Sequence, residues 1–177
     1  MGVQIGAKPD SGFDDPIGML KDCHRRVEHF LQILCVVADR APGRALTTEE
    51  VSAVEAALHY FQVGGRRHTA DEEESLFPRL RADAQSAGLE DLTELEAEHQ
   101  KANDLHAAVE SLYKSWIVNR RLPAEDEQRL LAATKQLKLL YDDHIEVEER
   151  IVFPRAARIL DGATIAAIGA EFRARRG

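Results

Sequence analysis

One pattern occurs twice in this chain, and it constrains the fold more than any other feature of the sequence. The first copy runs from His68 to Arg79 and the second from His144 to Arg155, and both read H-x3-E-E-x3-F-P-R without a gap. Because chance rarely repeats a fixed spacing over so many positions in a short chain, the pattern indicates a duplicated helical unit. The rest of the chain is then interpreted as the scaffold that brings the two copies together.

Each copy places a histidine and a glutamate four residues apart. On an α-helix this spacing puts both side chains on one face, one turn from each other, where imidazole and carboxylate can bind one metal ion or two neighbouring ions. A further histidine precedes each copy, His24 by 44 residues and His99 by 45. In an antiparallel bundle these side chains lie at a similar height, which predicts a metal site in the core. The six candidate ligands are His24, His68, Glu72, His99, His144 and Glu148.

Apolar residues recur at helical spacing in four long stretches and one short one, and no strand pattern accompanies them. Asp15-Pro16 is a helix start, and residues 47–50 form a capping box. The expected helices cover about 15–40, 47–76, 89–119 and a stretch from 123 past 151, with Ile151 facing inward. They predict an all-α, up-down-up-down four-helix bundle with a short C-terminal helix. The expected division is an N-terminal extension at 1–13, the bundle at 14–160 and the short helix at 161–177.

Two features are expected to disturb the helices that carry the repeated pattern. Gly64-Gly65 stands one turn before His68, where glycine costs helix stability, so close packing or room for a ligand is expected there. Phe77-Pro78 and Phe153-Pro154 are expected to bend or end their helices and to pack aromatic bulk against the site.

The composition argues against several classes of partner and location. A net charge of −8 argues against nucleic acid or an anionic membrane as a partner, since both favour a basic surface. The apolar runs are too short for a membrane span and the N-terminus lacks the apolar core of a signal peptide, so a cytoplasmic location is expected. Cys23 and Cys35 lie on one predicted helix about 18 Å apart, beyond disulfide reach, and are expected to be buried thiols.

Four imidazoles and two carboxylates suit iron, manganese or zinc, and argue against a magnesium or calcium site built from oxygen ligands alone. Two carboxylates that face each other across a bundle can each bridge two ions, with two histidines per ion completing the protein's share. About four protein ligands per ion leave positions open to a small molecule. A closed, tetrahedral structural zinc site would not use six ligands.

The order His, His-x3-Glu, His, His-x3-Glu, with E-E-x3-F-P in each copy, resembles the hemerythrin-like (HHE cation-binding) family over about residues 14–158. The resemblance implies a non-haem, carboxylate-bridged centre of two Fe ions that binds O2, NO or peroxide, with the six candidates as ligands. The ferritin-like di-iron family is disfavoured, because it has glutamate where His24 and His99 stand and Glu-x2-His in place of His-x3-Glu.

One position departs from the oxygen-carrying members of that family, which have a fifth histidine four residues after the third. This chain has Asn103 there, which favours reactive chemistry or labile iron over reversible oxygen carriage. Glu28 and Tyr141 are alternatives for the missing ligand, although core packing is favoured for Tyr141. His29 and His59 are out of phase with the ligand positions and are expected at the surface.

Three further residues have two interpretations each. Glu73 and Glu149 either accept a ligand histidine's N–H from a neighbouring helix or form solvated salt bridges. His106, two turns beyond His99, is too far to share the metals and is expected to form a core hydrogen bond or to line an access channel.

Other functions stay open at this point. The same centre could serve a di-iron redox enzyme or an iron donor, in NO or peroxide reduction or iron–sulfur repair. A third interpretation is an interaction module whose metal is structural. The expected partner is a small-molecule ligand, with neither nucleic acid nor membrane, and the chain is expected to be a monomer or a homodimer.

Overall fold

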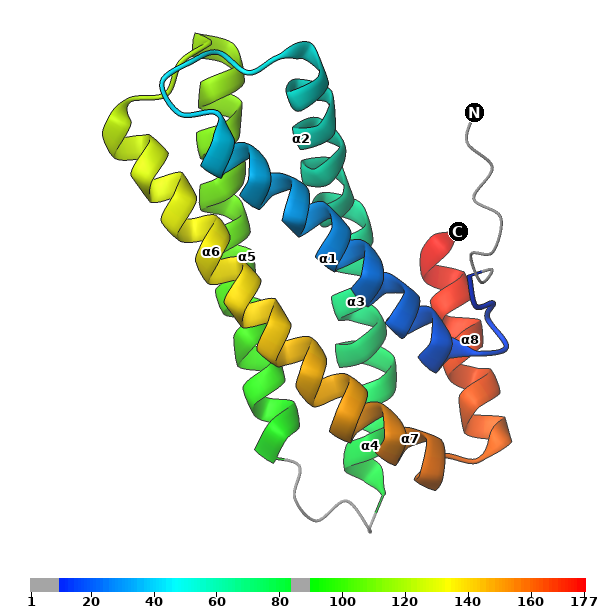
Figure 1. Cartoon of the computed structure of the whole chain (residues 1–177). Coiled ribbons are helices and arrows are strands. Elements are labelled where there is room, and N and C mark those ends of the chain that lie inside the picture. The colour runs from blue at the N-terminus through cyan, green and yellow to red at the C-terminus, as the bar shows by residue number, and fades with distance from the viewer. Residues whose placement is uncertain (1–9, 84–89) are drawn as a thin grey trace.

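The computed structural model describes residues 10–83 and 90–177, and every regular element in these ranges is helical (Figure 1). The absence of any strand from the described residues confirms the all-α prediction. The helices form four long runs and a final short helix; segments labelled η are single π-helical turns. The first run is α1 (Pro16–Arg40); the second is α2 (Thr48–Tyr60), η1 (Phe61–Gly65), α3 (Arg66–Asp71), η2 (Glu72–Leu76) and α4 (Phe77–Ala82); the third is α5 (Glu90–Asn119); the fourth is α6 (Ala124–Val147), η3 (Glu148–Val152) and α7 (Phe153–Ile159); the final helix is α8 (Gly162–Arg176).

The four runs enclose one core. Helix α1 contacts α2 and α6, and α5 contacts the same two helices from the other side, so the runs close a ring (Figure 1). Helix α8 packs against α1, α3 and η2. The expected start of the third helix at residue 89 lies outside the described residues, where α5 is first seen at Glu90.

The helix starts are those that the sequence predicts. Asp15 accepts a hydrogen bond from the Gly18 amide at 2.9 Å, with Pro16 at the first helical position of α1. Thr47 and Glu50 form the full capping box of α2, each side chain bonded to the other's backbone amide. These caps satisfy amides that have no partner inside the helix.

Two apolar clusters fill the core on either side of a polar layer. On α1, Leu20 belongs to one cluster and Val27 to the other, with buried His24 between them. On α5 the same boundary falls between Leu95 and Ala102. Full burial of a large aliphatic side chain contributes about 1.5–3 kcal/mol, so the two clusters offset the cost of placing polar groups between them.

The Phe-Pro pairs are expected to bend or end their helices, and the second alternative is wrong, since the second run continues to Ala82 and the fourth to Ile159. The reason is a π turn before each pair. The Phe77 amide bonds to the Glu72 carbonyl, five residues back, and the Phe153 amide bonds to the Glu148 carbonyl in the same way. The wider turn accommodates a proline ring that would clash in a regular α-helix.

The prediction that Ile151 faces inward is also wrong, because its side chain is 48% exposed. Ile151 lies within η3, where the additional residue in the turn shifts the helical phase. A stripe extrapolated at α-helical spacing from His144 therefore misses the inward face, which the neighbouring Val152 occupies instead.

The described part of the N-terminal segment lies over α8. A Cβ atom added at Gly169 would meet the Phe13 carbonyl oxygen at 1.9 Å, so only glycine allows this close approach. The Ser11 amide donates to the Asp22 carboxylate at 2.6 Å. The expectation of a loosely ordered or draped extension concerns mostly residues 1–9, which lie outside the described residues.

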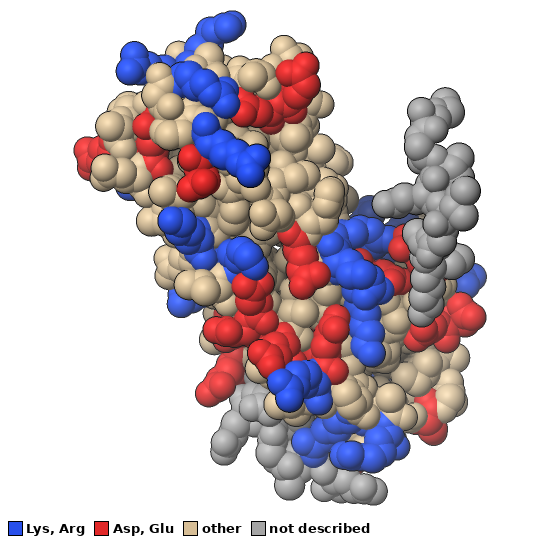
Figure 2. Space-filling model, viewed as in Figure 1, with Lys and Arg blue, Asp and Glu red and all other residues tan. Residues whose placement is uncertain are grey.

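No described helix combines the length and the hydrophobicity that a membrane span needs. Acidic and basic side chains are interspersed over the face shown in Figure 2. Cys23 is buried and Cys35 is half-buried, and both are free thiols.

Candidate metal centre

The structure brings all six predicted ligands together in the polar layer. They come from every run of the ring: His24 from α1, His68 and Glu72 from α3 and η2, His99 from α5, and His144 and Glu148 from α6 and η3. All six side chains are buried, and both glutamates have no exposed surface at all.

Glu72 faces two histidines from different helices with its two oxygens. Oε1 lies 3.3 Å from Nε2 of His68, and Oε2 lies 3.4 Å from Nε2 of His99. Since His68 is one α-helical turn before Glu72, the first contact follows from the His-x3-Glu spacing. The second requires α5 to pack across the bundle.

Glu148 repeats this arrangement for the other two histidines. Its Oε2 lies 3.0 Å from Nε2 of His24, and its Oε1 lies 3.5 Å from Nε2 of His144. Ring nitrogens and carboxylate oxygens therefore form two groups of four, with the atoms of each group within 4.8 Å of one another. Both glutamates belong to both groups. The first group also contains His24 and His68, and the second His99 and His144.

Nε2 of His99 lies 3.1 Å from Nε2 of His144, but most of the other atoms converge without satisfying one another. Both oxygens of Glu72, both oxygens of Glu148 and Nε2 of His24 are buried and have no hydrogen-bond partner among the described residues. Burying an unpaired polar group costs free energy, and a buried carboxylate without a partner costs much more. Two cations, each between two imidazole nitrogens and two carboxylate oxygens, would satisfy this set, so the residues fit a pair of metal ions.

Burial and the neighbouring groups together set the charge state of the centre. It raises the pKa of Glu72 well above its usual range, with the Glu148 charge adding to the effect. Burial likewise lowers the pKa of His68 well below its usual value, aided by His24. For Glu148, burial also acts to raise the pKa, but the imidazoles of His144 and His24 outweigh it and lower the pKa well below its usual range. The two facing carboxylates thus compete for charge, and a bound cation would remove this conflict.

Three of the four imidazoles are held from behind by carboxylates of a neighbouring helix. Nδ1 of His24 lies 2.9 Å from Glu149, and Nδ1 of His99 lies 2.7 Å from Glu73. The structure thereby supports the first of the two interpretations of these glutamates. Nδ1 of His144 lies 2.8 Å from Glu98, a contact that sequence reasoning missed. A carboxylate that accepts the Nδ1 proton leaves Nε2 free to bind a metal.

The phenylalanines of the repeated pattern also pack on two of the predicted ligand histidines. The Phe153 ring stacks on His24 with centroids 5.3 Å apart, and the Phe77 ring is parallel to His99 at 6.4 Å. This confirms that the Phe-Pro pairs place aromatic bulk against the site. Each copy of the pattern therefore supports, with its second glutamate and its phenylalanine, the lone histidine of the other half.

Comparison with known families gives an independent result. The family model of the hemerythrin HHE cation binding domain matches residues 15–156. The chain belongs to the hemerythrin HHE cation-binding domain family. It is also 27% identical over 164 residues to a protein of Haemophilus influenzae described as uncharacterized, a match that covers 93% of this chain and 91% of the relative. The predicted family resemblance is thus confirmed, and membership implies cation binding.

Two π turns begin at the two buried glutamates of this hemerythrin HHE domain. Glu72 is the first residue of η2 and Glu148 the first of η3. Single π turns in α-helices are frequent at functional sites, because they redirect side chains without breaking the helix. Here they change the helical phase between the ligand and the Phe-Pro pair.

The remaining polar residues that the sequence singled out lie away from the two groups. His29, His59 and Glu28 are exposed, as expected for the two histidines, and Glu28 belongs to neither metal-binding group. Tyr141 is not in these groups either; its hydroxyl lies 3.0 Å from Nε2 of His106, which confirms a core hydrogen bond for this histidine.

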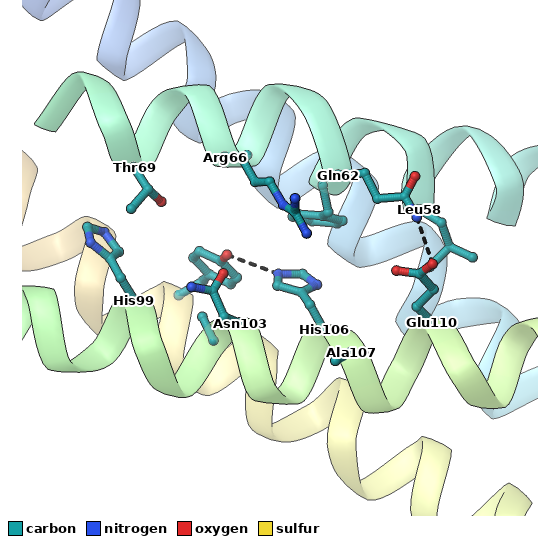
Figure 3. Close-up of a pocket in the computed structure, with 13 residues that line it drawn as sticks. Leu58, Gln62, Arg66, Thr69, His99, Asn103, His106, Ala107 and Glu110 are labelled. Atoms are coloured by element: carbon teal, nitrogen blue, oxygen red, sulfur yellow. Dashed lines mark hydrogen bonds between the residues drawn. The ribbon is translucent and has the colours of Figure 1, made fainter. Parts of the chain in front are cut away.

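A pocket of about 410 Å³ opens beside the second group. One wall is α5, with His99, Asn103 and His106, and the other is the η1–α3 segment, with Arg66 and Thr69 (Figure 3). Asn103, at the position of the absent fifth histidine, is exposed here. Gly65 also lines the pocket, which agrees with the expectation of room for a ligand next to the glycine pair.

Proposed function

We propose that this hemerythrin HHE domain is an up-down-up-down bundle that holds a non-haem, carboxylate-bridged di-iron centre and binds O2 or a related small molecule such as NO or peroxide. The proposed ligands are His24, His68, Glu72, His99, His144 and Glu148.

One observation carries the proposal. The two carboxylates have four buried, unpaired oxygens, and each carboxylate directs one oxygen to each histidine pair. A single ion would leave one histidine pair without a metal, and with no ion the four carboxylate oxygens would stay buried without a hydrogen-bond partner. A bridged pair of ions uses every atom of the set.

The donor set suits iron, which accepts imidazole and carboxylate ligands together. Each ion would receive two nitrogens and two oxygens, so about two positions of an octahedron would stay open. When bound, such an iron pair supplies sites for O2, NO or peroxide and electrons for their reduction. Within the protein, Glu149, Glu73 and Glu98 orient the imidazoles by accepting their Nδ1 protons.

The pocket supports small-molecule binding over a purely structural metal. His99, a proposed ligand, forms part of its lining, so a molecule that enters from solvent reaches the edge of the centre. A structural site gains nothing from such an opening, since its ligands close the coordination sphere. With Asn103 in place of a fifth histidine, the metal beside the pocket would have fewer protein ligands. This favours redox chemistry at the centre, which is the second candidate function.

The experiment compares the inner glutamates, which are the proposed ligands Glu72 and Glu148, with the outer glutamates Glu73 and Glu149, which contact the imidazoles from behind. Glu72→Ala and Glu148→Ala should each lower the bound metal from about two ions per chain to one or none, because each removes a shared ligand. The matched variants Glu73→Ala and Glu149→Ala should retain both ions but bind them about 10–100-fold more weakly. Elemental analysis and chelator competition measure both effects. Greater metal loss in the outer variants than in the inner ones would contradict the assignment.

A further inference from the structure

The three tyrosines of this chain differ in what their hydroxyl groups contact. Tyr60 donates to the Cys23 carbonyl and Tyr113 to the Leu34 carbonyl. A backbone carbonyl accepts a hydrogen bond but does not take up a proton. Tyr141 is different, because its hydroxyl bonds to an imidazole nitrogen, which is a base.

Both side chains of the Tyr141–His106 pair are uncharged at neutral pH. Burial raises the pKa of Tyr141, so the phenol stays protonated. Burial also lowers the pKa of His106 to about 4, although the Glu110 carboxylate on the same helix opposes the shift. A neutral imidazole has one nitrogen with a free lone pair, and we assign Nε2 as the acceptor of the phenol's proton. Arg66 lines the opposite wall of the pocket, and its side chain is exposed.

The ring and the hydroxyl group of Tyr141 contact different side chains. The ring lies edge-on to the ring of His144, a proposed metal ligand, with centroids 6.5 Å apart and planes at 78°. The hydroxyl is bonded to His106, whose own ring packs on Phe61 at 4.2 Å. An electron leaving the phenol ring and a proton leaving its oxygen thus have separate, short routes.

The duplication shows that packing alone does not require this pair. Tyr141 stands three residues before His144, and the residue three before His68 is Gly65. His106 stands seven residues after His99, and the residue seven after His24 is the buried Leu31. The first half of the bundle therefore fills the equivalent positions with a leucine and a glycine. The phenol and the imidazole occur together in one half only, on the side of the pocket.

We propose that Tyr141 is a one-electron donor to the metal centre, with Nε2 of His106 taking the phenolic proton as the electron leaves. The inference rests on the proposed iron centre as the destination of the electron. It adds a redox role for two residues that bind no metal. Tyr60 and Tyr113 lack a base for this step and are excluded from it.

With hydrogen peroxide as the oxidant, the step balances. Reduction of one peroxide to two waters needs two electrons and two protons. One electron would come from a centre with a single ferrous ion and the other from Tyr141, which becomes a neutral phenoxyl radical when its O–H bond breaks. The phenolic proton stays on His106 as imidazolium, and the two protons consumed come from solvent. The pocket beside His99 admits both peroxide and water.

The pair is tested first without any metal redox chemistry. The full chain is loaded with zinc, which has no redox activity, and is oxidised by a photochemical one-electron oxidant. Electron paramagnetic resonance should show a persistent phenoxyl radical that Tyr141→Phe removes and that Tyr60→Phe and Tyr113→Phe retain. His106→Gln keeps a hydrogen-bond acceptor but no base, and should shorten the radical's lifetime at least tenfold. A radical that survives Tyr141→Phe, or is unaffected by His106→Gln, would overturn the proposal.

The link to the centre is tested in iron-loaded protein poised with one ferrous ion per centre, after metal analysis of each variant. Rapid freezing after addition of hydrogen peroxide should trap the same radical in the wild type and not in Tyr141→Phe. Oxidation of bound iron without any tyrosine radical would overturn the donor role even if the zinc experiment succeeds. Failure of the proposed function has a separate sign, since the metal analysis would then find no iron.

Discussion

At the scale of single residues, the imidazoles of the centre are oriented by carboxylates that the repeated pattern supplies only in part. Glu73 and Glu149 belong to the pattern, whereas Glu98 directly precedes the proposed ligand His99 on α5 and contacts His144 on another helix. Both kinds fix the tautomer of the ring they contact, because the carboxylate accepts the Nδ1 proton. His68 lacks such a partner among the described residues.

Glu98 gives the first prediction. Glu98→Gln should weaken metal binding by about 10–100-fold, because the amide no longer stabilises the N–H of a metal-bound imidazole. Competition with a chelator measures the affinity. Glu94→Gln, one turn earlier on α5 and exposed, is the matched control and should bind as the wild type does. Equal affinities for both variants would show that Glu98 does not act on His144.

His106 predicts a dependence of stability on pH. Its pKa in the folded chain is about 4, below the usual 6.5, so the unfolded chain binds its proton first. The contribution of His106 to the free energy of unfolding is fully present above pH 6.5. It is lost as the pH falls toward 4, because the unfolded chain is protonated over this range before the folded chain. By pH 5 the loss is on the order of 2 kcal/mol. Thermal unfolding should therefore depend less on pH in His106→Gln than in the wild type. Parallel curves for the two proteins would contradict the shift.

Four of the six proposed ligands were predictable because the His-x3-Glu spacing acts within one helix, and His24 and His99 because each precedes a copy of the pattern by a similar distance. Glu98 was not, since its contact depends on how α5 and α6 pack and no spacing within either helix encodes that. Ile151 was misplaced because a period of 3.6 residues does not hold through η3. Sequence periodicity therefore predicts the centre better than its outer contacts.

At the scale of elements, α8 stabilises the segment that carries Glu72. Arg175 and Arg176 both pair with Asp71, which is fully buried and directly precedes Glu72. Arg175 also donates to Ser75 at 2.8 Å, within η2. The sequence predicts that α8 is a helix but not where it packs, because its ion pairs join residues that are about a hundred positions apart in the chain.

Removing the ion pairs of Arg175 and Arg176 with Asp71 should destabilise the protein. The double variant Arg175→Ala, Arg176→Ala leaves the Asp71 charge buried and unpaired, which costs about 3–5 kcal/mol, and should lower the melting temperature and the affinity for metal. Adding Asp71→Asn should restore part of the stability, because the buried charge is then gone. Arg158→Ala, at an exposed position, is the control. An unchanged melting temperature in the double variant would show that α8 contributes nothing to this segment.

At the scale of the whole molecule, a polar layer crosses the bundle between two apolar clusters. Each helical run supplies at least one of the six side chains to this layer. The all-helical fold and most helix boundaries follow from caps and periodicity, whereas the passage of two runs through proline follows from π turns that no pattern announces. The layer is costly without cations, so the fold and the metal are linked.

The measurement that tests the central claim most directly is the iron content and absorption spectrum of the full chain. Protein loaded with ferrous iron without oxygen should hold about two ions per chain, and near-ultraviolet and visible bands should appear when O2 is admitted. Fewer than one ion per chain, or two ions with a spectrum that O2 leaves unchanged, would contradict a di-iron centre that binds small molecules.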